Sequence, residues 1–68
     1  MKKNFLYKKI ELTENLNLIL KKGQHGVVLE IINKDTVFAE FYDQYNQQIE
    51  VDNELVFEVR MNQFRLYD

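Results

Sequence analysis

The sequence contains no cysteine, proline, tryptophan or serine, and only two glycines among its 68 residues. Without cysteine the chain cannot form a disulfide or a thiolate metal site. Without cysteine and serine it also lacks the nucleophile of a Ser–His–Asp or Cys–His arrangement. The single histidine, His25, supplies one imidazole, too few for a histidine-based zinc site. We therefore predict that the protein is not an enzyme and uses no metal or other cofactor.

Long hydrophobic runs are also missing. No segment approaches the roughly 20 apolar residues of a membrane span, and the apolar run near the N-terminus is too short for a signal peptide. We expect a cytoplasmic protein without membrane contact. What is present is an apolar fraction of 46%, with five phenylalanines and four tyrosines that can bury a large area. Because 68 residues allow one domain, we expect a single domain over residues 1–68.

Alternating or continuous apolar runs of strand length predict an all-β protein. The expected strands cover residues 8–12, 26–32, 36–42, 48–51, 54–61 and 64–67. Tight turns are expected at 33–35 and 43–46, made by Asn and Asp, which tolerate positive φ. Residues 13–22 are expected to form a loop with at most one or two helical turns. Five or six short strands at this spacing predict a small SH3-like (KOW-like) barrel, most simply a five-stranded one that is partly open.

The two glycines stand three residues apart, just before a predicted strand. Gly23 is expected to take a turn conformation closed to other residues. Gly26 is expected to permit a bulge or a close backbone approach where the strand enters the barrel. A phosphate-binding loop needs more glycines followed by Lys and Ser or Thr at a helix, and a KH-type GXXG clamp needs flanking helices. We interpret both glycines, and His25 between them, as structural.

Charge is unevenly distributed along the chain. Residues 1–22 carry six lysines and two glutamates, a net charge of +4, whereas residues 23–68 carry three basic and nine acidic residues, a net charge of −6. Aromatic residues of the C-terminal half stand among these acids. Because contacts to phosphates dominate nucleic-acid affinity, this pattern makes nucleic acid an unlikely ligand and favours a protein partner with a basic surface.

The candidate binding residues lie on the predicted strand 36–42 and in the turn that follows it. If Phe41 points inward, side-chain alternation places Phe38, Glu40 and Tyr42 together on the opposite face. Exposed tyrosines are typical of protein-recognition surfaces. The residues expected to bind the partner are Phe38, Glu40, Tyr42, Asp43 and Tyr45.

Three segments resemble a small bacterial family catalogued as domain of unknown function 4926: LTENL at 12–16, LKKGQHGVVLE at 20–30 and FAEFYD at 38–43. The second segment is also similar to the KOW-type element of ribosomal and transcription-factor barrels, which shares the G-x-x-G-x-V pattern. The resemblance covers roughly residues 6–51 and the final strand, and it implies a stand-alone SH3-like barrel. The chain departs from the family at His25, where an apolar residue is usual, and at residues 52–61, which look longer than the family's usual end.

Members of this family are frequently encoded beside toxin-like or nuclease-like proteins. The resemblance therefore implies an antitoxin or immunity role, in which a basic toxin or nuclease is bound and neutralised. One alternative is a KOW-like nucleic-acid or ribosome-associated protein; another is a phage-encoded inhibitor of a host nuclease. The first alternative would use the lysines Lys2, Lys3, Lys8, Lys9, Lys21 and Lys22. Homo-oligomerisation stays open in each case.

Overall fold

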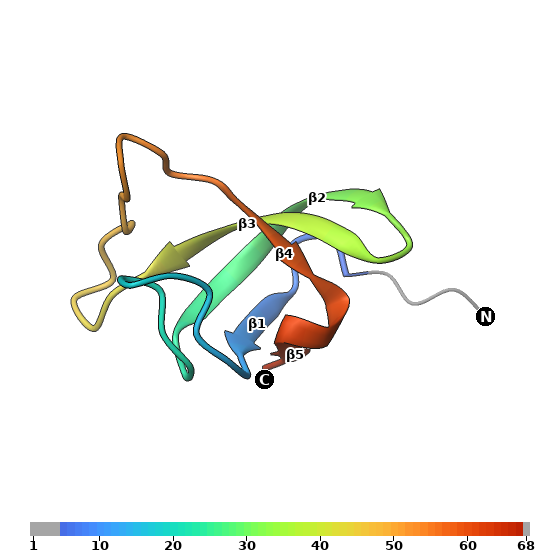
Figure 1. The fold of residues 1–68 in the computed structure, drawn as a ribbon, viewed down its shortest axis with the longest axis horizontal. Coiled ribbons are helices and arrows are strands. Elements are labelled where there is room, and N and C mark those ends of the chain that lie inside the picture. Colours follow the sequence, from blue (N-terminus) through green and yellow to red (C-terminus); the bar gives the residue numbers. More distant parts are fainter. Residues whose placement is uncertain (1–4, 68) are drawn as a thin grey trace.

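The computed structural model describes residues 5–67, which form five strands and one short 3-10 helix (Figure 1). The elements are β1 (Lys9–Leu12), β2 (His25–Asn33), β3 (Thr36–Tyr42), β4 (Phe57–Arg60), η1 (Met61–Gln63) and β5 (Phe64–Leu66). They make one antiparallel sheet in the order β4-β3-β2-β1-β5. The sheet curves, but its edge strands β4 and β5 are not paired with each other. The predicted all-β, partly open fold of five strands is confirmed.

The hairpin between β2 and β3 closes through a two-residue turn at Lys34 and Asp35. The Asn33 side chain accepts a hydrogen bond from the backbone N–H of Asp35 at 2.8 Å, which fixes the turn. Farther along, the register between the two strands shifts twice, between Val28 and Glu30 and again between Ile31 and Asn33. Such irregularities increase the local twist of a strand, and they help this long hairpin to curve around the core.

The core lies against one face of the sheet. Its buried side chains are Ile10, Leu12, Leu20, Val28, Val37, Ala39, Phe41, Val59 and Phe64. On β3 the alternation is complete, because Val37, Ala39 and Phe41 are buried while the residues between them are half-buried. The expectation that Phe41 points inward is therefore confirmed. Full burial of such a side chain contributes roughly 1.5–3 kcal/mol, so β3 anchors the fold.

Backbone conformation at the two glycines differs. Gly23 has φ 94°, in the region that side chains rarely adopt. Gly26 pairs with Phe41 of β3, and a Cβ atom added there would lie 2.6 Å from Cδ1 of the Phe41 ring and would also meet the Glu40 carbonyl oxygen. The Phe41 ring thus packs directly on the Gly26 backbone. A non-glycine residue with positive φ that no pattern predicts is Tyr7, at φ 60°.

The segment 13–22 is a loop without helix, as expected. Its asparagines hold it together. The Asn17 carboxamide oxygen accepts the backbone N–H groups of Ile19 and Leu20 at 2.8 and 2.7 Å, and the Asn15 oxygen accepts that of Lys22 at 2.8 Å. Leu20 is thereby placed in the core, where it is fully buried. Asparagine favours local turns of this kind over helix.

A strand was expected at 48–51, and the structure has only isolated bridges there; the strand expected at 54–61 is present but is confined to residues 57–60. The backbone N–H of Ile49 donates to the Phe41 carbonyl at 2.8 Å, and Phe57 pairs with Ala39. Residues 48–49 and β4 therefore follow the same edge of β3, and the chain leaves that edge over residues 50–56. We call residues 50–56 the edge excursion (Figure 1).

The edge excursion is closed by a tight turn of its own. Val51 and Glu54 exchange two backbone hydrogen bonds of 3.0 and 2.9 Å around Asp52 and Asn53, whose φ angles are 52° and 67°. Two positive φ angles in succession are the signature of a type I′ turn. Leu55 lies within the strand expected at 54–61, but it is 43% exposed in the excursion.

Candidate functional site

The predicted binding residues of β3 lie on its outer face, where two of them are joined by a hydrogen bond. The Tyr42 hydroxyl donates to Oε1 of Glu40 at 2.6 Å, and the Gln48 side chain donates to Oε2 at 3.0 Å. The hydrogen bond to Glu40 raises the pKa of the Tyr42 phenol above 10.0; partial burial and the negative charge of Glu40 act in the same direction. Tyr42 therefore stays neutral at physiological pH.

The turn after β3 presents the next two predicted residues. Oδ1 of Asp43 accepts the backbone N–H groups of Tyr45 and Gln47 at 2.8 and 3.0 Å. Asn46 completes the turn at φ 63°, donating its N–H to the Asp43 carbonyl at 2.9 Å. These bonds leave the Tyr45 side chain at the tip, where it is 76% exposed. A large exposed ring on a hydrogen-bonded turn is suited to binding.

A row of side chains crosses the outer face beside Tyr42. His25 on β2 lies opposite Tyr42 on one side and Glu11 of β1 on the other. Arg65 of β5 binds Oε1 of Glu11 through Nε at 2.7 Å and through a terminal nitrogen at 2.5 Å, while Nε2 of His25 is 3.8 Å from Oε2 of Glu11. The Tyr67 ring stacks on His25, with ring centroids 4.0 Å apart. Four strands thus position one row.

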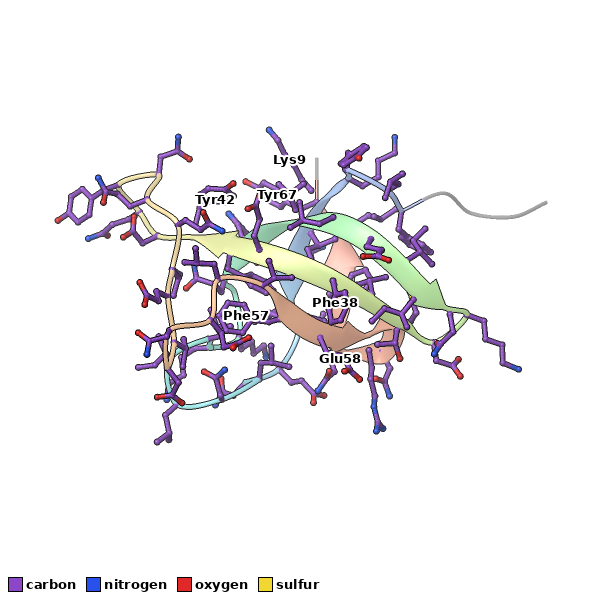
Figure 2. The ribbon with its side chains drawn as sticks, turned by 90° about the horizontal axis from the view of Figure 1, so that it is seen from above. Lys9, Phe38, Tyr42, Phe57, Glu58 and Tyr67 are labelled. Carbon is purple, nitrogen blue, oxygen red and sulfur yellow. The ribbon has the colours of Figure 1, made fainter. Side chains whose placement is uncertain are left out.

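Two adjoining grooves meet along this row. The first is lined by Lys22, Gly23, Gln24, His25, Tyr42, Asp43, Gln44 and Tyr45. The second is lined by Lys9, His25, Gly26, Val27, Tyr42, Asp43, Asn46 and Tyr67. Together they form a surface that we call the aromatic groove, whose central members are His25, Tyr42, Asp43, Tyr45 and Tyr67. Figure 2 shows Lys9, Tyr42 and Tyr67 near one another on the outer side of the sheet.

Phe38 does not belong to this groove. It is half-buried and lies opposite Glu58 of β4 and Glu30 of β2. Figure 2 shows Phe38 and Glu58 at a distance from Tyr42 and Tyr67. Of the predicted residues, Tyr42, Asp43 and Tyr45 line the groove, and Glu40 supports Tyr42 from behind.

The groove also contains His25 and Tyr67, which the sequence did not indicate as binding residues, and Lys9 and Lys22, which were predicted only for the nucleic-acid alternative. His25 and Tyr67 are brought together by the pairing of β1 with both β2 and β5. That pairing joins residues more than 50 positions apart, such as Glu11 and Arg65, so no local pattern could indicate it. The β2–β3 hairpin was predicted, but a regular register extended from its turn would place His25 opposite residue 43 or 44. The two register shifts between the strands bring His25 opposite Tyr42 instead, and no local pattern indicates them.

The charges of the groove are mixed. Lys9 and Lys22 line its two parts, and Asp43 lies in both. Neither lysine forms an ion pair with another residue of the described part of the chain, where the ion pairs are those of Glu11. The groove is thus not uniformly acidic, although the sequence around β3 is.

Within residues 5–67, no group of three or more His, Asp or Glu side chains is arranged to hold a metal ion. The same part of the chain contains no helix with the length and hydropathy to cross a membrane. Comparison with protein-family models, with curated proteins and with solved structures finds no match. The resemblance to domain of unknown function 4926 therefore stays a prediction.

Proposed function

We propose that this protein is a small non-enzymatic binding module that recognises another protein through the aromatic groove. The observation that carries this proposal is the gathering of four ring side chains, those of His25, Tyr42, Tyr45 and Tyr67, around one exposed groove. Tyrosine is enriched among the residues that dominate binding energy at protein interfaces. Its ring offers a large contact area and loses little conformational entropy on binding.

The partner in this proposal is a toxin-like or nuclease-like protein with a basic surface, which the module binds and neutralises in the cytoplasm. Two observations support it. The chain resembles a family encoded beside such proteins, and its residues 23–68 carry a net charge of −6. An acidic protein is steered toward a nuclease, whose cleft is basic in order to receive nucleic acid. A phage-encoded inhibitor of a host nuclease would use the same surface and would differ only in its target.

The test is co-purification with the product of the adjacent gene, followed by calorimetric titration of the purified pair. Tyr45→Ala should weaken binding at least tenfold, which corresponds to about 1.4 kcal/mol. The melting temperature should stay nearly unchanged because Tyr45 is 76% exposed. Tyr7→Ala is the matched control, since Tyr7 is 71% exposed and does not line the groove. Equal affinity for the Tyr45 and Tyr7 variants would exclude the groove as the interface.

The second candidate is binding of single-stranded nucleic acid, and the position of Lys9 and Lys22 favours it. Lysines beside exposed rings are the combination that single-strand binders use, with bases stacked on the rings and phosphates on the amines. Fluorescence anisotropy with a labelled oligonucleotide at low salt separates the two functions. Binding that collapses as salt rises, and that Lys9→Glu with Lys22→Glu abolishes, would favour nucleic acid. The protein-binding proposal predicts no measurable affinity at physiological salt.

A further inference from the structure

The centre of the aromatic groove has the chemistry of a site for a positively charged, planar group. We propose that Tyr42, Asp43 and Tyr45 form a receptor for an arginine side chain of the partner protein. This inference rests on the proposed function and specifies the group that the partner presents. All three residues line the same part of the groove.

Asp43 supplies the negative charge. Its Oδ1 accepts the backbone N–H groups of Tyr45 and Gln47, which fixes the orientation of the carboxylate. An ionised carboxylate offers about four acceptor positions, and Oδ2 has no hydrogen-bond partner among residues 5–67. The carboxylate is therefore oriented in advance and still able to accept hydrogen bonds from an incoming donor.

Tyr42 and Tyr45 supply ring faces. The face of a tyrosine ring carries partial negative charge and attracts cations. The Tyr42 hydroxyl donates to Glu40, a bond that shifts electron density toward the ring and increases this attraction. Glu40 also places a second negative charge next to the Tyr42 hydroxyl. Tyr45, on the turn that Asp43 stabilises, is exposed enough for a ligand to lie against it.

The geometry favours arginine over lysine. A guanidinium is planar, stacks on aromatic rings and is less strongly hydrated than an ammonium group. Lys9 and Lys22, in the two parts of the groove, repel further cations. The receptor thus suits a single arginine and disfavours a run of basic residues.

The experiment uses the isotope-labelled full-length protein and two probes, N-acetyl-arginine methylamide and N-acetyl-lysine methylamide. Two-dimensional amide NMR should show shifts at residues 42–47 on titration with the arginine probe. A dissociation constant in the millimolar range is expected for one such side chain. The lysine probe should bind at least threefold more weakly. Equal shifts with both probes, or shifts elsewhere on the sheet, would overturn the proposal.

Asp43→Asn is the decisive variant, because its amide oxygen can still accept the two backbone hydrogen bonds of the turn. It should weaken binding of the arginine probe at least fivefold, and Tyr45→Ala should do the same. Asp35→Asn, in the other hairpin, is the control and should bind as the wild type does. Undiminished probe binding by Asp43→Asn would refute the receptor.

Measuring how the same variants bind the partner protein distinguishes a failure of this inference from a failure of the proposed function. If Asp43→Asn binds the partner as the wild type does while Tyr45→Ala does not, the groove is the interface but it holds no arginine. If neither variant weakens partner binding, the groove is not the interface, and both proposals fail.

Discussion

Tyr42 is held by a hydrogen bond that exists only while its phenol is protonated. The hydroxyl donates to Glu40, and this bond raises the pKa of Tyr42. Because the folded state raises the pKa, it favours the protonated form. The resulting stabilisation is complete below pH 10, the ordinary pKa of tyrosine, and is lost as the pH rises through the raised value.

Tyr42→Phe should therefore lower stability by about 0.5–1.5 kcal/mol at pH 7, the range of an ordinary hydrogen bond, because solvent reaches Glu40 and weakens the bond to its carboxylate. Urea unfolding of the wild type and the variant between pH 7 and pH 11 measures the difference. The difference should be constant up to about pH 9 and should shrink at higher pH. A difference that grows above pH 10 would contradict the hydrogen bond to Glu40.

Replacing Gly26 even by alanine should lower the free energy of unfolding strongly. In Gly26→Ala the new methyl group would meet the Phe41 ring and the Glu40 carbonyl, both of which belong to the central strand β3. Overpacking of this kind costs typically about 1–3 kcal/mol, and we expect the upper end because backbone atoms cannot move aside. Chemical denaturation measures the loss.

The control for Gly26→Ala is Gly23→Ala, where a Cβ would meet nothing within 4 Å but φ is 94°. Only backbone strain, of order 1 kcal/mol, is then expected. A larger loss at Gly23 than at Gly26 would show that the Phe41 ring does not pack on Gly26 as described.

Among the elements, the edge excursion has the least influence on the sheet. Residues 49 and 57 are placed opposite Phe41 and Ala39, so Glu40 alone separates the two points where the chain leaves and rejoins β3. Residues 50–56 are exposed except Val51, which packs against the core. The sheet therefore does not require them.

Replacing residues 50–56 by a single threonine should convert residues 48–60 into one continuous strand. We expect the fold to persist and the stability to change by less than about 2 kcal/mol, because the lost contacts of Val51 are partly offset by the lower entropy cost of a shorter loop. Circular dichroism, amide NMR and urea unfolding test this. An unfolded or aggregated product would mean that the excursion is needed to complete the core.

Strand prediction from the sequence succeeded where the alternating apolar residues are the buried ones, and it failed where alternating apolar residues are exposed. On β3 the buried and half-buried residues alternate as the sequence indicates, and the strand ends where predicted. In the excursion, Leu55 continues the apolar alternation that ends in Phe57 and Val59, yet it is exposed. The chain leaves the sheet after Gln48 pairs with Tyr42 and Ile49 donates to Phe41, and these contacts are invisible in the local sequence pattern.

The part of the groove that was predicted from the sequence is the part made by residues close together in the chain. Tyr42, Asp43 and Tyr45 follow one another on a strand and its turn, and they do line the groove. Tyr67 joins them because β5 pairs with β1, a contact between the two ends of the described chain. Such pairings are set by tertiary structure, and sequence periodicity carries no information about them.

The whole molecule is held together by contacts between distant parts of the chain. β1 pairs with β5, and β1 also links this pair to the β2–β3 hairpin. Proteins dominated by such non-local pairs fold in milliseconds to seconds. Slow phases of tens of seconds come from proline isomerisation, and this chain has no proline.

Stopped-flow refolding should therefore give a single exponential phase in the millisecond-to-second range, with no slower phase. Double-jump experiments, in which the delay in denaturant is varied, should leave the refolding amplitude unchanged. A slow phase that grows with the delay would have to come from another process, such as association of unfolded chains.

Because His25 stacks on Tyr67, the imidazole protons can serve as an NMR probe of the folded protein. The chain has one histidine, so its ring protons give isolated resonances. Because the rings are stacked with centroids 4.0 Å apart and planes inclined by 28°, the tyrosine ring current should shift those resonances upfield. The shift depends on β2, β1 and β5 being assembled in register. The position of one histidine line in a one-dimensional proton spectrum would therefore report whether the sheet is intact. It would also report the binding of any molecule that displaces the tyrosine ring.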